Sequence, residues 1–166
     1  MKRKKMMVTM AAVMLCIANL TGCGTSYNDV NVSTFWDGLE EKGFSQTYDL
    51  TEAYLASQED QDLSYMDEMA YYFDGEKEFI LIDTKSASQA EKLFESLTEQ
   101  YDEMVNTKVT TTVNGASKWT GKHSDNDICL VVYKTNDDVI VGSGKVEDAD
   151  LLKGTIEFVL TRESKE

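Results

Sequence analysis

The stretch Ile128-Cys129-Leu130-Val131-Val132-Tyr133 decides the fold. It is apolar at both alternating sets of positions, so it predicts a strand buried on both faces at the centre of a sheet. The turn residues Asn136-Asp137-Asp138 follow and lead into a second β-branched run, Val139-Ile140-Val141. Two such runs joined by a short turn favour antiparallel pairing.

Two hairpin signals lie upstream of this pair. Asp74-Gly75 and Asn114-Gly115 supply the positive backbone angles that tight hairpin turns require. Tyr48 and Leu50 indicate a further short strand in a less regular region. The strand-like runs around the two turns are 69–73 with 79–82, and 109–113 with 118–120.

Helical periodicity appears in three segments. A helix from Ser33-Thr34 to about Lys42 is followed by Gly43, which suits a left-handed cap. A second helix begins at Ser86 or Ser88, since both have capping-box spacing, and it has the clearest apolar face. Residues 149–160 fit either a final helix or a terminal strand. The sequence therefore predicts an α+β domain over residues 34–166, with an antiparallel sheet of about five to six strands and two to three helices packed mainly on one face.

The first 23 residues have the organisation of an export signal. Basic residues occupy positions 2–5, and the apolar stretch 6–17 is too short to span roughly 30 Å of hydrocarbon comfortably. Leu20-Thr21-Gly22-Cys23 closes this leader and resembles the lipobox of bacterial lipoproteins. The alternative is an ordinary signal peptide in which Cys23 follows the small residues by chance.

The lipoprotein resemblance implies a location. A lipoprotein signal peptidase would remove residues 1–22, and the Cys23 thiol would carry a diacylglyceryl group. Two acyl chains give a stable anchor, so we expect a protein held on the extracytoplasmic face of the cell membrane. Residues 23–33 are predicted to form the lipidated cysteine and a short polar tether, and no other cofactor is expected.

The composition excludes some classes of partner. Removal of residues 1–22 leaves 12 basic against 30 acidic residues, a net charge of −18. Such a charge disfavours nucleic acid and a polybasic membrane patch. Only Cys129 remains in the folded domain, so no intramolecular disulfide is expected there.

No residue pattern points to catalysis. His123 is followed by Ser124-Asp125, but sequence neighbours do not assemble a catalytic triad. Cys129 lies in an apolar strand and suits core packing. Gly142-Ser143-Gly144 lacks the spacing of a nucleophile elbow. An enzyme is therefore not favoured.

Two weaker features concern binding. Acidic residues cluster at 59–62, 125–127 and 137–138, where oxygen ligands could attract calcium, although none matches an EF-hand and no metal site is assigned. The aromatic residues Tyr72 and Trp119 are candidates for an interaction surface. We expect a non-enzymatic domain that binds a membrane-proximal protein or envelope component. The alternative is a lipoprotein that binds a cation or small ligand through its acidic loops.

Overall fold

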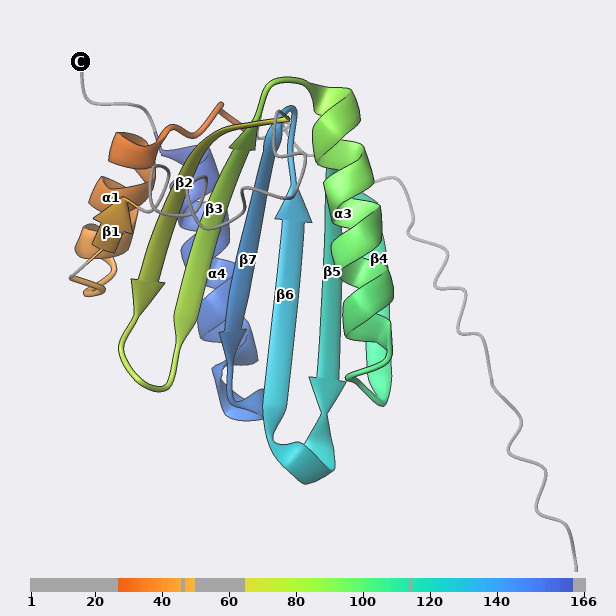
Figure 1. The fold of residues 1–166 in the computed structure, drawn as a ribbon. Coiled ribbons are helices and arrows are strands. Elements are labelled where there is room, and N and C mark those ends of the chain that lie inside the picture. The colour runs from red at the N-terminus through yellow and green to blue at the C-terminus, as the bar shows by residue number, and fades with distance from the viewer. Residues whose placement is uncertain (1–26, 46, 50–64, 114, 163–166) are drawn as a thin grey trace, which may run out of the picture.

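A single antiparallel sheet forms the centre of the molecule (Figure 1). The structure is a computed structural model and describes residues 27–45, 47–49, 65–113 and 115–162. The strands lie in the order β1-β2-β3-β7-β6-β5-β4. Their bounds are β1 Thr47–Asp49, β2 Met66–Phe73, β3 Glu78–Thr84, β4 Thr107–Val113, β5 Ala116–His123, β6 Ile128–Lys134 and β7 Asp138–Gly144.

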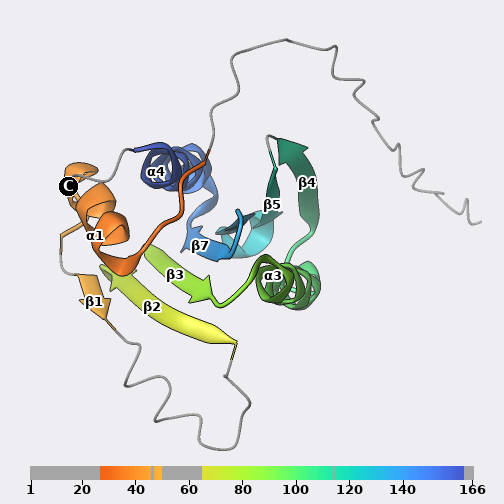
Figure 2. The same cartoon turned by 90° about the horizontal axis from the view of Figure 1, so that it is seen from above.

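The helices cover both faces of the sheet. Figure 2 shows α1 and α4 on one side of the sheet and α3 on the other. We call these sides the α4 face and the α3 face. The bounds are α1 Val32–Glu41, α3 Ala87–Asp102 and α4 Ala149–Thr161, with short 3-10 turns η1 Ser124–Asn126 and η2 Val146–Asp148.

The larger core lies on the α4 face. Phe35 and Leu39 of α1 are fully buried there. Burial of such side chains is the main stabilising term in a fold of this size. Val30, Val32 and Phe44 join them from α1 and its flanks, and the other members come from α4 and four strands: Ala149, Leu152, Ile156, Val159, Leu160, Ala70, Tyr72, Phe79, Leu81, Cys129, Val131, Tyr133 and Ile140.

A second core lies on the α3 face. Ala90 and Phe94 of α3 pack against a set of buried side chains from β5, β6 and β7. That set is Trp119, Leu130, Val132, Val139 and Val141. Because β6 contributes to both cores, it is buried on both faces, as its unbroken apolar sequence predicts.

The α+β prediction is confirmed. Six strands have seven or eight residues each, and the three-residue β1 adds a seventh in the described part of the chain. Residues 149–161 form a helix, which decides between the two predicted alternatives. Two of the three described helices share the α4 face, while α3 covers the opposite one.

Local sequence explains where the helices begin and end. The Ser86 side chain accepts a hydrogen bond from the Gln89 backbone N–H, so the earlier of the two predicted caps starts α3. At the end of α1, Gly43 has φ +88°, and the Phe44 N–H donates to the Leu39 carbonyl over 2.9 Å. This pattern is a Schellman cap, and it buries Phe44.

The segment before α1 is packed onto the domain. The Asn28 N–H donates to the Leu160 carbonyl at 2.9 Å, and the Val30 N–H donates to Asp138 Oδ2 at 2.8 Å. Val30 is 2% exposed and Val32 is 8% exposed. The expected tether over residues 23–33 is therefore shorter than its polar composition suggests, because its second half belongs to the fold.

Candidate functional site

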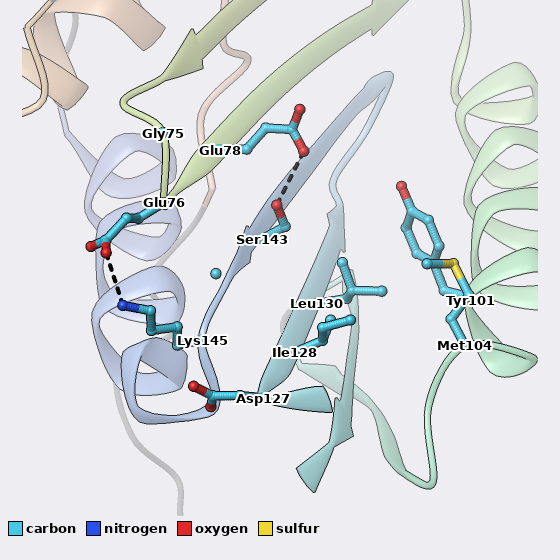
Figure 3. A pocket seen from close by; sticks show the side chains of 11 residues that line it. Gly75, Glu76, Glu78, Tyr101, Met104, Asp127, Ile128, Leu130, Ser143 and Lys145 are labelled. Carbon is cyan, nitrogen blue, oxygen red and sulfur yellow. Dashed lines mark hydrogen bonds and ion pairs between the residues drawn. The ribbon is translucent and has the colours of Figure 1, made fainter. Parts of the chain in front are cut away.

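A pocket of about 560 Å³ opens on the α3 face (Figure 3). It lies between the turn of the β2–β3 hairpin, the end of α3 and the ends of β6 and β7. Residues far apart in sequence, from Gly75 to Lys145, line it. The β-sheet register brings them together, because Glu78 of β3 pairs with Ser143 of β7.

One part of the pocket is apolar. Ile128 and Leu130 project from β6, and Tyr101 and Met104 approach from the α3 side (Figure 3). Met104 is 49% exposed, so part of its side chain is accessible to a ligand or partner. Such a floor can bury the apolar part of a ligand or partner.

The polar part of the pocket centres on Glu78. The Ser143 hydroxyl donates to Glu78 Oε2 over 3.1 Å. At the mouth, Lys145 Nζ donates to Glu76 Oε1 over 2.8 Å. Asp127, at φ +52°, also lines the pocket, and its Oδ1 accepts from the Val146 N–H at 3.1 Å.

Two tyrosines show the influence of the Glu78 charge. Burial raises the pKa of Tyr101, and the Glu78 carboxylate raises it further. Burial likewise raises the pKa of Tyr71, with added contributions from the Glu78 charge and a hydrogen bond to it. Both phenols therefore stay protonated at neutral pH. The pocket combines an anionic acceptor with neutral hydroxyl groups and an apolar floor, an arrangement suited to noncovalent binding.

The residues that were weighed as catalytic candidates lie in separate parts of the structure. His123 ends β5, and its Nδ1 accepts from the Asn126 N–H at 3.3 Å, so it caps the η1 turn. Cys129 is fully buried on the opposite face from the pocket, and burial raises the pKa of its thiol. Ser143 and Gly144 of the Gly142-Ser143-Gly144 segment line the pocket.

The two aromatic candidates lie in the core. Tyr72 is 5% exposed and packs on the α4 face, and Trp119 is 2% exposed and packs under α3. Neither ring offers a surface to a partner, because helices cover both faces of the sheet. The neighbouring Phe73, at 49% exposure, is the more accessible ring, and it stacks on Tyr71 with centroids 6.5 Å apart.

Asp29 lies beside the predicted acidic cluster at residues 137–138. Carboxylate oxygens of Asp29, Asp137 and Asp138 lie within 4.8 Å of one another. Asp29 is exposed and accepts from the Asn136 side-chain amide at 2.6 Å, whereas Asp138 is 1% exposed. Of the other predicted clusters, 125–127 contributes Asp127 to the pocket mouth, and 59–62 lies outside the described residues.

Crowding of these carboxylates changes their titration. Burial raises the pKa of Asp138 to about 8, against the opposing hydrogen bond from Val30, and the charges of Asp83, Asp137 and Asp29 add to the rise. Burial and the neighbouring acids raise the pKa of Asp83 to about 6. Removing water from a carboxylate disfavours its charged form. This end of the sheet therefore concentrates repulsion between acidic groups.

The pocket could not be assembled from sequence alone. Its members come from the β2–β3 turn, β3, β6, β7 and the end of α3, and no sequence motif links these segments to one another. The strand-like run predicted at 79–82 stops short of Glu78 and does not indicate that this residue lies on the face that meets α3. The lipobox residues Leu20, Thr21, Gly22 and Cys23 lie outside the described residues.

Comparisons with known proteins do not assign a family. No family model matches the chain, and no curated protein matches it. Among solved structures, a GTP binding regulator from Thermotoga maritima is 12% identical, with a TM-score of 0.47, over 82% of this chain and 90% of that chain. A likeness this distant does not indicate a shared ligand. Within the described residues, no helix is long and apolar enough to cross a membrane.

Proposed function

We propose that this protein is a lipoprotein anchored on the extracytoplasmic face of the membrane, where its domain binds a membrane-proximal protein or envelope component without catalysing a reaction. The observation that carries the anchoring is the leader, in which basic residues, an apolar stretch and Leu20-Thr21-Gly22-Cys23 follow in lipoprotein order. A diacylglyceryl group on Cys23 supplies two acyl chains, which suffice for stable anchoring.

The start of the fold supports a domain held close to the membrane. Tyr27 is the first described residue, and its neighbour Asn28 is hydrogen-bonded to the end of α4. Three residues separate Cys23 from Tyr27, and the four residue-to-residue steps span at most about 14 Å. The domain would therefore engage partners that lie at or near the bilayer surface.

The pocket at Glu78 supports the binding role. A segment or small molecule that places an apolar group over Ile128 and Leu130 would bring a hydrogen-bond donor or positive charge to Glu78. The site lies on the α3 face, whereas the N-terminal segment joins α4 on the other face. Anchoring would thus leave the pocket accessible to a partner.

Cell fractionation tests the anchoring. The wild-type chain should sediment with membranes, and Cys23→Ala should appear in the soluble extracytoplasmic fraction. Cys129→Ala is the matched control, because it removes the buried cysteine without touching the leader. Equal sedimentation of the Cys23→Ala variant and the wild type would contradict the proposal.

Crosslinking in cells tests the binding role of the pocket. A photoreactive residue in place of Met104 should capture a specific envelope component, because Met104 lines the pocket and is half exposed. The same residue in place of Glu95, on the exposed side of α3, is the control. The same adducts at both positions, or none at Met104, would count against the pocket as the binding site.

A second candidate function is cation binding, which the meeting of Asp29, Asp137 and Asp138 favours. A divalent cation would relieve the repulsion among these carboxylates, and calcium prefers such oxygen ligands. Calorimetric titration with calcium should then give a saturable signal that Asp137→Asn abolishes. The absence of any heat or thermal shift with the wild-type protein would remove this candidate.

A further inference from the structure

The β4–β5 hairpin differs in charge from the rest of the chain. Residues 104–124 contain Lys108, Lys118, Lys122 and His123 but no Asp or Glu, so all 30 acidic residues of the chain lie outside this stretch. The hairpin is also the last pair of the sheet, since β4 forms its edge. In a strongly acidic protein, this edge is a local exception.

The hairpin borders a groove of about 470 Å³ on the α4 face. Lys118 and Lys122 of β5 and Lys153 of α4 line it, with Glu157 as its single carboxylate. Figure 2 shows the β4 end of the sheet curling toward the side that carries α4. Basic side chains from two elements are thereby gathered on one side of the molecule.

The outer strand of the groove is exposed along its whole length. Every residue of β4 is exposed, and Val109 and Val113 are 64% and 41% exposed. These valines line the groove together with Thr111, which pairs with Lys118. A surface of lysines, threonines and small apolar groups suits the headgroup region of a bilayer, where phosphates accept hydrogen bonds and apolar groups reach the acyl boundary.

The chain enters the domain beside this groove. The Lys118 ammonium lies 5.3 Å from the centroid of the Tyr27 ring, and 2.9 Å from Glu157 Oε1. Tyr27 is only four residues from Cys23, which places the proposed anchor within about 14 Å of Tyr27, beside the groove. The Debye screening length is about 8 Å at physiological ionic strength. A domain held by so short a connection must therefore present one of its faces to the lipid headgroups.

We propose that the β4–β5 hairpin and Lys153 form the face of this domain that lies on the membrane, in contact with anionic lipid headgroups. This inference rests on the proposed lipid anchor. The net charge of −18 repels an anionic surface as a whole, so the acid-free edge is the side that can approach it. Because the groove lies on the α4 face, docking by this edge leaves the α3 face, with its pocket, on the side of the sheet that faces away from the membrane.

Fluorescence quenching on vesicles tests the orientation. The lipidated full chain would carry a fluorophore at Thr111→Cys, or at Glu95→Cys on α3 as the control, in phosphatidylglycerol-containing vesicles with spin-labelled lipid headgroups. Cys129 is fully buried and stays unlabelled. We expect quenching at position 111 to be several-fold stronger than at position 95. Equal quenching at the two positions in protein that sediments with the vesicles would overturn the orientation.

Charge reversal tests the role of the lysines. Lys122→Glu with Lys153→Glu should reduce quenching at position 111 several-fold without reducing sedimentation. Lys85→Glu with Lys92→Glu makes the same charge change away from the groove and should leave quenching unchanged. The same loss in both double variants would contradict a specific lysine contact. Failure of the wild-type protein to sediment would instead contradict the lipid anchor, so the two proposals fail separately.

Discussion

Val30 and Asp138 link the N-terminal segment to the middle of the sheet, because the Val30 N–H donates to Asp138 Oδ2 over 2.8 Å across 108 residues of sequence. Asp138 begins β7, a central strand, and Val30 lies just before α1. The bond attaches the segment nearest the proposed anchor to the middle of the sheet. A pull on the N-terminus would thus be transmitted to the core rather than to a free linker.

Asp138 makes the stability of the domain depend on pH. Burial raises its pKa to about 8, above the unfolded value of about 3.9. A raised folded pKa contributes stability that is fully present below about pH 4 and is lost as the pH rises through 8. Asp138→Asn keeps an acceptor for Val30 and removes this loss. At pH 8 we expect the free energy of unfolding of the variant to be larger than that of the wild type by a few kcal/mol, which is the order that such a pKa shift implies.

Urea unfolding at pH 5, 6, 7 and 8 measures this effect. Asp150→Asn is the control for net charge, because the Asp150 side chain is 99% exposed. The difference between Asp138→Asn and the wild type should grow with pH, while the control follows the wild type. A constant difference across this range would show that Asp138 does not titrate as inferred.

Val30 should behave as a core residue rather than as part of a tether. Val30→Ala removes two methyl groups from a side chain that is 2% exposed, so unfolding should become easier by roughly 2 kcal/mol. Ser33→Ala alters an exposed position in the first turn of α1 and should have little effect. Thermal unfolding of the two variants compares them directly. Similar midpoints would place the start of the fold after residue 33.

The prediction of the sheet from sequence succeeded where local signals were strong. The unbroken apolar run at 128–133 identified β6, and Asp74-Gly75 marked the β2–β3 turn, where Gly75 has φ +99°. Alternation along 71–73 also puts Tyr72 on the opposite face from Tyr71 and Phe73. It gave no information on which face each helix covers, because that depends on contacts between distant segments.

Contacts between distant segments also explain why the burial of some residues, and the pocket, could not be predicted from the sequence. Val30 and Val32 alternate with the polar residues Asp29, Asn31 and Ser33, a weak apolar pattern within a polar segment, and their burial depends on α4 and β7. Trp119 is buried because α3 crosses above β5. The pocket at Glu78 requires the register of β3 with β7 and the end of α3, none of which a local pattern contains.

Gly121 and Gly154 should respond in opposite ways to a methyl group. A Cβ at Gly121 would lie 2.3 Å from the Trp119 ring, whereas a Cβ at Gly154 meets nothing within 4 Å. Gly121→Ala should therefore destabilise the domain by about 1–3 kcal/mol through overpacking. Gly154→Ala should stabilise it by about 0.5–1 kcal/mol through helix propensity.

Denaturant titration followed by tryptophan fluorescence measures both glycine variants. Gly121→Ala should also shift the emission of the folded protein, because Trp119 must move to accept the methyl group. Gly154→Ala should leave that emission unchanged, since it lies on the exposed side of α4. An equally stable Gly121→Ala variant would mean that Trp119 is packed more loosely than the structure describes.

The mass of the intact protein extracted from membranes tests the central claim most directly. A lipoprotein processed at the lipobox should have the mass of residues 23–166 with a diacylglyceryl group on Cys23, and the Cys23→Ala variant should lack that species. A membrane-extracted chain that retains residues 1–22, or one that begins at residue 23 without a lipid, would contradict the account.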